Sequence, residues 1–444
     1  MLRNLLLLSA IALTSPVGLA DGPSMVRVAG TPEQIGKIWG EMNKDVIARD
    51  MNATYLKKAA EAGISREVLI ARSAAFVRIS KEIAPHWLEE AAATARAAGV
   101  DEDIYIAFVD GQSRNRFLHE DALVECTSYA VSRDHARDGA ILFHKTRDNV
   151  DRPQMAVIVD SSLDTINKFV TITDGSRLRC SMMVNEQGLA GSGDYPAHRK
   201  KDSSTLHLEP AAPQYRGLMG GSILRHIAER ASTSAEALAI IEDFVEKGYY
   251  SGGDVNGSHW LFVDREGVIL EVCNNARHVV SMVHTQKAYF SRLNKSPAAR
   301  RLREATEPID FALFQSISRD PSICFKSSIS GMTVEIDPDH PELFTCAWIA
   351  LPVRAAAFPL FMGQTCTPAV LADGAACASG KESPPQVSRW EAMEQAMHAE
   401  KERFETELRE SIAAGNPTQA HVELLEEWSR DQAAMLVEAL KQSE

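Results

Sequence analysis

The apolar pattern of this chain changes from helical to strand-like near residue 123, and a cysteine, Cys126, lies at the change. Residues 30–120 repeat apolar side chains at helical spacing, starting with the capping sequence Thr31–Gln34. Short β-like segments follow from residue 128, separated by turn signals such as Asp138-Gly139. Two helices are expected at 221–247, and strands resume after residue 260. This order predicts a layered α+β domain.

The two ends of the chain have their own signatures. Arg3, an apolar stretch and the small residues before Asp21 follow the order of an export signal, with a buried N-terminal helix as the alternative. Residues 364–389 are rich in small residues and proline, as in a linker, and residues 390–444 show two helical stripes. We therefore expect a signal peptide at 1–20, a helical segment at 21–125, a catalytic domain at 126–363, the linker, and a C-terminal helical hairpin. A periplasmic or secreted location follows from the signal.

Composition excludes several classes of protein. The chain has 47 Lys and Arg against 60 Asp and Glu, a net charge of −13, which argues against a nucleic-acid partner. No apolar run beyond the signal is long enough to span a bilayer. The common zinc, P-loop and serine-hydrolase motifs are absent from the sequence, so we expect no metal and no cofactor.

Cys126 is the best candidate for a chemically active residue. Most cysteines are small buried hydrophobic side chains, and that is the alternative here. Cys180, Cys273, Cys324 and Cys346 lie in strand-like apolar segments, where burial or pairing is expected. The total of seven cysteines is odd, which leaves at least one thiol unpaired.

Five segments in order resemble one family. They are Gly30–Gly36, Ala84–Val100, Glu125–Asn149 around the cysteine, Asn185–Leu189, and Trp260–Glu271. Together, over about residues 25–363, they are similar to the isopenicillin-N acyltransferase family of cysteine N-terminal-nucleophile enzymes, which is related to the choloylglycine and penicillin V amidases. This resemblance implies a four-layer αββα fold. It also implies that the precursor cuts itself between Glu125 and Cys126, which makes Cys126 the N-terminal nucleophile.

The resemblance also implies roles for other residues. Asp148 would bind the new α-amine, and Lys145 matches a basic position that accompanies this aspartate. A turn or surface carboxylate and a solvated strand-end lysine are the plainer interpretations. An amine next to a thiol gives the nucleophile its own base, because the two groups titrate near 7.7–8.0 and 8.5.

The oxyanion donors are less well defined by the sequence. Asn256 is our choice from the family's pattern, with Ser258 or His259 as alternatives in a shifted register and an ordinary tight turn as the plain interpretation. Backbone N–H groups of a turn through 190–194 are further candidates. Arg300 matches the family's arginine segment, or else lies on a solvated basic face.

The leading hypothesis is an exported, self-processing amidohydrolase that cleaves a small linear amide through a thioester. Its partners would be that small-molecule amide and its own cleaved N-terminal segment. Transfer of the acyl group to an amine is the first alternative, and a non-catalytic binding protein on the same fold is the second. A papain-like protease would need a histidine partner motif, which the sequence lacks.

Overall fold

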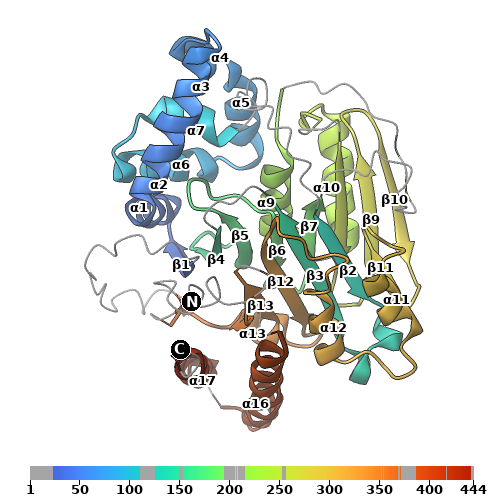
Figure 1. Ribbon diagram of the computed structural model, residues 1–444. Coiled ribbons are helices and arrows are strands. Elements are labelled where there is room, and N and C mark those ends of the chain that lie inside the picture. The colour runs from blue at the N-terminus through green and yellow to red at the C-terminus, as the bar shows by residue number, and fades with distance from the viewer. Residues whose placement is uncertain are drawn as a thin grey trace.

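The computed structural model describes residues 24–110, 126–149, 154–194, 206, 208, 216–252, 257–351, 353, 355–368, 371, 387–416 and 418–441. Two sheets pack face to face with helices on both outer sides, as Figure 1 shows. The predicted four-layer αββα architecture is confirmed. None of the described helices combines the length and apolar character needed to cross a membrane.

The first sheet, sheet A, contains eight described strands. In spatial order they are β1 (Ser24–Gly30), β4 (Gln154–Ser161), β5 (Phe169–Asp174), β6 (Met182–Asn185), β7 (Ala190–Asp194), β8 (Ser258–Val263), β9 (Ile269–Asn274) and β10 (Val279–His284). Only the described β1–β4 pair is parallel; the other described pairs of this sheet are antiparallel. The strand β1 precedes Cys126 in the chain, so the N-terminal segment completes one edge of the sheet.

The second sheet, sheet B, contains six described strands. In spatial order they are β11 (Ala288–Phe290), β2 (Thr127–Val131), β3 (Ile141–Asp148), β12 (Ser328–Ile336), β13 (Cys346–Ala350) and β14 (Phe358–Phe361). The expected hairpin around residue 338 is present as the β12–β13 pair, with a short helix, α13 (Pro341–Phe344), in its connection. The β2–β3 hairpin that follows Cys126 contains two 3₁₀ turns, η2 (Arg133–His135) and η3 (Arg137–Gly139).

Helices of the N-terminal segment and of the middle of the chain cover sheet A. They are α1 (Pro32–Met42), α2 (Lys44–Arg49), the π-helix η1 (Asp50–Leu56), α3 (Lys57–Glu61), α4 (Arg66–Arg72), α5 (Ala74–Ile83), α6 (His86–Ala98), α7 (Glu102–Asp110), α9 (Gly220–Arg230) and α10 (Ser234–Glu246). The capping box at Thr31 and Gln34 starts α1 as predicted. One buried core joins these helices to the outer face of the sheet.

Gly36 and Gly40 set the crossing of α1 and α6. A Cβ at Gly36 would lie 2.2 Å from the carbonyl oxygen of Glu90, and one at Gly40 would lie 2.4 Å from that of Thr94. The backbones therefore approach too closely for any larger residue at either position.

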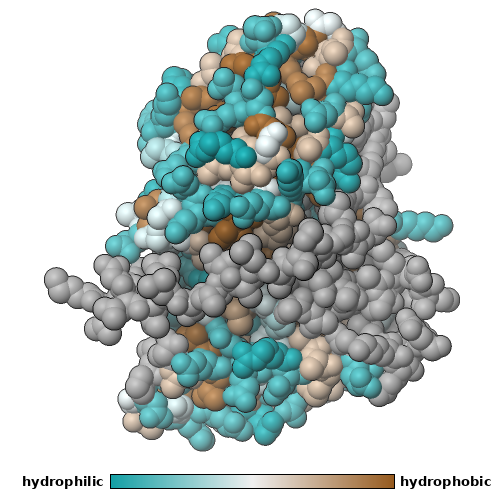
Figure 2. Space-filling model, turned by 90° about the vertical axis from the view of Figure 1, so that its left-hand side faces the viewer, coloured by the Kyte–Doolittle hydropathy of each residue, from teal (hydrophilic) through white to brown (hydrophobic). Residues whose placement is uncertain are grey.

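Shorter helices and the C-terminal pair cover sheet B. They are α11 (Pro297–Glu304), α12 (Phe311–Ile317), α16 (Val387–Ala413) and α17 (Thr418–Lys441). The predicted helical hairpin is present, and its first helix docks through an ion pair of Glu394 with Arg319, both buried. In Figure 2 the C-terminal helices and the N-terminal helices present mostly hydrophilic faces with small apolar patches.

Candidate active site

Cys126 directly precedes β2 and is almost completely buried, with 6% of its surface exposed. Side chains alternate between the two faces of a strand, so Cys126, Ser128 and Ala130 share one face. Ala130 belongs to the core between the two sheets. The thiol therefore faces the layer between sheets A and B, and it is not part of a disulfide.

A buried ion pair crosses this layer beside the thiol. Lys145 of β3 lies 3.0 Å from Asp194 Oδ1 of β7, and their side chains are 1% and 0% exposed. The Lys145 ammonium also donates to the backbone carbonyls of Ser181, at 2.9 Å, and Gly193, at 2.5 Å. Lys145 is therefore not a solvated strand-end residue. Each of its described contacts stabilises the buried positive charge of its ammonium group.

Three serines complete the surroundings of Asp194. Its Oδ2 accepts from the hydroxyls of Ser128, at 2.9 Å, and Ser291, at 2.8 Å. The Ser128 and Ser192 hydroxyls lie 2.7 Å apart. Burial acts to raise the pKa of Asp194, but Lys145, His259 and the Ser291 hydrogen bond outweigh it, so this pKa lies below its ordinary value. Asp194 is therefore a stable buried anion.

The charged groups around Cys126 have opposing effects on the pKa of its thiol. Burial raises the pKa of the Cys126 thiol, Lys145 lowers it, and the carboxylates of Asp194 and Asp148 raise it again. The net pKa is above the ordinary value. The thiol is therefore protonated near neutral pH.

Asp148 lies at the end of β3, completely buried. Its carboxylate acts to raise the pKa of the Cys126 thiol, which the Lys145 ammonium acts to lower, so both groups lie near the thiol. One of its oxygens accepts from the hydroxyl of Ser328, its cross-strand neighbour. The structure thus brings Cys126, Lys145 and Asp148 into one neighbourhood, and it rules out an exposed carboxylate at 148.

The other predicted residues fall elsewhere. Asn256 lies outside the described residues. Ser258 bonds the Tyr250 hydroxyl at 2.6 Å, and its neighbour in the strand, His259, points to the opposite face and bonds Glu271. Arg300 is exposed on α11, consistent with a solvated basic face.

One prediction was wrong. Residues 190–194 form the strand β7 and not a turn, so their N–H groups are not gathered to meet an oxyanion. The sequence Ala-Gly-Ser-Gly-Asp has little strand character, but Gly191 and Gly193 lie against the rings of Phe262 and Trp260, where no larger side chain fits. Asp194, Ser128 and Ser291 were not foreseen, because the sequence gives no sign that these polar residues meet between the sheets.

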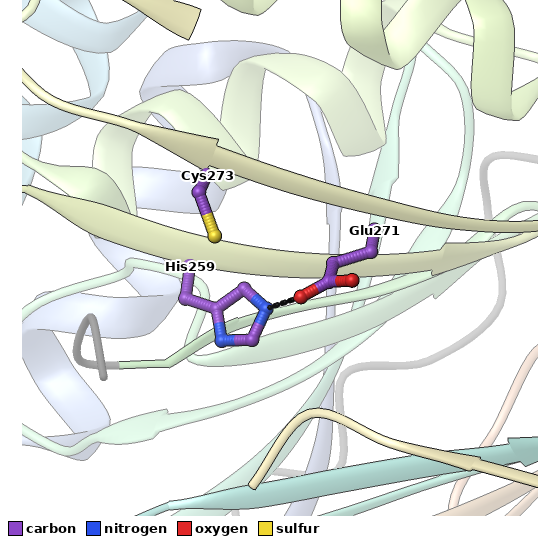
Figure 3. Close-up of side chains that lie close together, drawn as sticks. All are labelled: His259, Glu271 and Cys273. Atoms are coloured by element: carbon purple, nitrogen blue, oxygen red, sulfur yellow. Dashed lines mark hydrogen bonds and ion pairs between the residues drawn. The ribbon is translucent and has the colours of Figure 1, made fainter. Parts of the chain in front are cut away.

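A second polar cluster lies on sheet A in the same layer (Figure 3). Glu271 of β9 accepts from His259 Nε2 and His284 Nε2, each at 2.8 Å. The donor atoms of His259, Glu271 and Cys273 all lie within 4.8 Å of one another. Within the described part of the chain, this is the cluster with the composition and spacing to hold a metal ion.

Comparisons with known proteins give distant structural similarity. No protein-family model matches the chain, and no curated protein matches it. The chain is similar to a penicillin V acylase from Agrobacterium tumefaciens, with 14% identity over 53% of this chain and 86% of the other and a TM-score of 0.37. It is also similar to an N-acylethanolamine-hydrolyzing acid amidase ortholog from Caenorhabditis elegans, with 11% identity over 49% of this chain and 94% of the other and a TM-score of 0.35.

Proposed function

We propose that the protein is an exported amidohydrolase that cuts itself before Cys126 and then uses this residue as an N-terminal nucleophile. The observation that carries the proposal is the position of the thiol. It lies buried at the start of β2, beside an ion pair that joins the two sheets. A cysteine with a structural role alone does not need a fixed cation and two carboxylates around it.

The first step is the cut. The Cys126 thiol attacks the carbonyl carbon of Glu125, the carbon–sulfur bond forms, and the peptide carbon–nitrogen bond breaks. The proton of the thiol passes to the nitrogen, which becomes the α-amine of Cys126. Water then hydrolyses the thioester, which releases the carboxylate of Glu125 and restores the thiol.

The second step is turnover. The new amine accepts the proton of the adjacent thiol, because the two groups have similar ordinary pKa values. The thiolate attacks the amide carbonyl of the substrate, and the ammonium returns a proton to the leaving amine. Water then hydrolyses the thioester. Asp148 would hold the amine, and Lys145 would stabilise the thiolate by its charge.

The proposed substrate is a small linear amide, which would give a carboxylic acid and an amine. The export signature in the sequence favours hydrolysis of the thioester by water over a transfer reaction that depends on acyl-CoA. The alternative is an acyltransferase like isopenicillin-N acyltransferase, in which an amine attacks the same thioester. A binding protein on this fold would not need the buried Lys145–Asp194 pair beside an intact thiol.

The test of processing is the intact mass and N-terminal sequence of the purified protein. We expect two chains, one beginning with Cys126, and a single uncut chain for Cys126→Ala. Cys180→Ala is the matched control, because Cys180 is an equally buried free thiol elsewhere in the fold. A single intact chain in a preparation that hydrolyses amides would refute the proposal.

The test of the reaction is a panel of N-acyl amino acids and aminoacyl amides. Acid should appear without any added amine. If product forms only when a second amine is supplied, the enzyme is a transferase.

A further inference from the structure

Two adjacent strands of sheet A present three metal-binding side chains on one face. His259 of β8 lies directly opposite Cys273 of β9 in the antiparallel register. Glu271 lies two residues before Cys273, so it projects from the same face of β9. Donors at positions i and i+2 of one strand and at the facing position of the next are fixed by the sheet itself, with no loop needed to bring them together.

The chemistry and spacing of the three donors fit a transition-metal ion. Nitrogen, carboxylate oxygen and thiol sulfur are the ligand types of zinc sites. The donor atoms lie within 4.8 Å of one another, and the residues are 0%, 0% and 7% exposed. Ligands of tetrahedral zinc with bonds of about 2.0–2.3 Å lie roughly 3.3–3.8 Å apart. The His259–Glu271 contact of 2.8 Å would widen by about half an ångström to admit the ion.

One further observation points to a ligand at this position. The other oxygen of Glu271 is held by His284 at 2.8 Å, and His284 stacks on Tyr289 at 3.8 Å. A ligating carboxylate fixed by a second hydrogen-bonding residue is the usual arrangement around protein metal ions.

We propose that His259, Glu271 and Cys273 bind a divalent transition-metal ion, and that zinc fits them best. The Cys273 thiol loses its proton to solvent and binds as thiolate. The charges of the ion, the thiolate and the carboxylate then sum to zero, which suits a completely buried position. This site is separate from the chemistry proposed for Cys126, and the metal-site proposal does not depend on that function.

The ion should be present while the chain folds, because the cluster is closed to solvent. The experiment is therefore to produce the full-length protein in medium supplemented with Co²⁺ or Zn²⁺ and to purify it without chelator. We expect about one equivalent of metal per chain by elemental analysis. The Co²⁺ protein should show a near-ultraviolet thiolate charge-transfer band.

Variants assign the ligands. Cys273→Ala should abolish the charge-transfer band and the bound metal, and His259→Gln should lower the metal content at least tenfold. Cys346→Ala, a change in another buried free thiol, and Cys126→Ala should retain both the band and the metal. A melting curve without metal shows whether each variant is folded, and metal should raise the melting temperature of the wild type but not that of folded Cys273→Ala.

The proposal is overturned by wild-type protein that folds in Co²⁺ medium without bound metal. It is equally overturned if the band persists in Cys273→Ala and disappears in Cys126→Ala. In either case the cluster is a hydrogen-bonded part of the core.

Discussion

Replacing Lys145 by methionine tests whether the buried pair between the sheets holds the site together. The substitution nearly preserves volume but removes the ammonium that contacts two backbone carbonyls and Asp194. Asp194 would then keep the hydroxyl hydrogen bonds of Ser128 and Ser291 but lose its buried counter-ion. Removing one partner of a buried ion pair costs about 3–5 kcal/mol, so we expect a loss of that size in the free energy of unfolding.

The second variant, Lys145→Met with Asp194→Asn, separates the charge effect from packing. With no charge left unpaired, the double variant should recover part of the loss, with a coupling energy of about 2 kcal/mol. The assay is urea unfolding at pH 7, followed by circular dichroism. All variants should carry Cys126→Ala, so that each is compared as one uncut chain.

The exposed pair of Lys247 and Asp243, at 2.9 Å, is the matched control. Lys247→Met should leave the free energy of unfolding nearly unchanged, because solvent screens that pair. If Lys145→Met costs less than about 1 kcal/mol, or if the double variant shows no coupling, then the pair does not carry the energy assigned to it.

Three further outcomes are expected. Asp148→Asn should still be cut before Cys126 but should hydrolyse amides slowly, because its proposed partner, the amine, exists only after the cut; an uncut Asp148→Asn protein on mass analysis would contradict this role. Gly36→Ala should destabilise the protein by about 1–3 kcal/mol in urea unfolding, whereas Gly220→Ala, where the nearest atoms lie at 3.4 Å, should have a much smaller effect. Burial acts to raise the pKa of Glu229, but Arg225 and His86 outweigh burial and lower this pKa to about 2 from 4.5. The ionised Glu229 therefore contributes fully to stability above pH 4.5, and this contribution is lost as the pH falls toward 2. Unfolding curves should therefore lose up to about 3 kcal/mol over this range, and Glu229→Gln should flatten the dependence.

The overall architecture was predictable because long periodic segments determine it. The stripe and caps of α1, the alanine-rich α6 and the alternating strands after Cys126 each carry a local pattern, and the structure has an element at each. The strand β7 was missed because its glycines interrupt the apolar alternation that marks a strand. Glycine is required at these positions because neighbouring aromatic rings leave no room for a side chain. Strand β1 was missed because it directly precedes the long helical run that begins with α1.

The site was only partly predictable for a different reason. Cys126, Lys145 and Asp148 lie on one hairpin, so their proximity follows from local sequence. Asp194 comes from the distant strand β7 and Ser291 directly follows β11, and their approach depends on how the sheets stack. No single-sequence pattern reports on that stacking. The same limit hid the cluster of Glu271 with His259 and His284.

The parallel pairing of β1 with β4 has a consequence for the kinetics of refolding. An uncut chain can refold by a first-order process. A chain cut before Cys126 must recruit its edge strand, together with α1 and α6, from a separate molecule, so its refolding becomes second-order and slows on dilution. The uncut chain would therefore unfold reversibly, whereas the cut protein would stay folded mainly because its unfolding is slow.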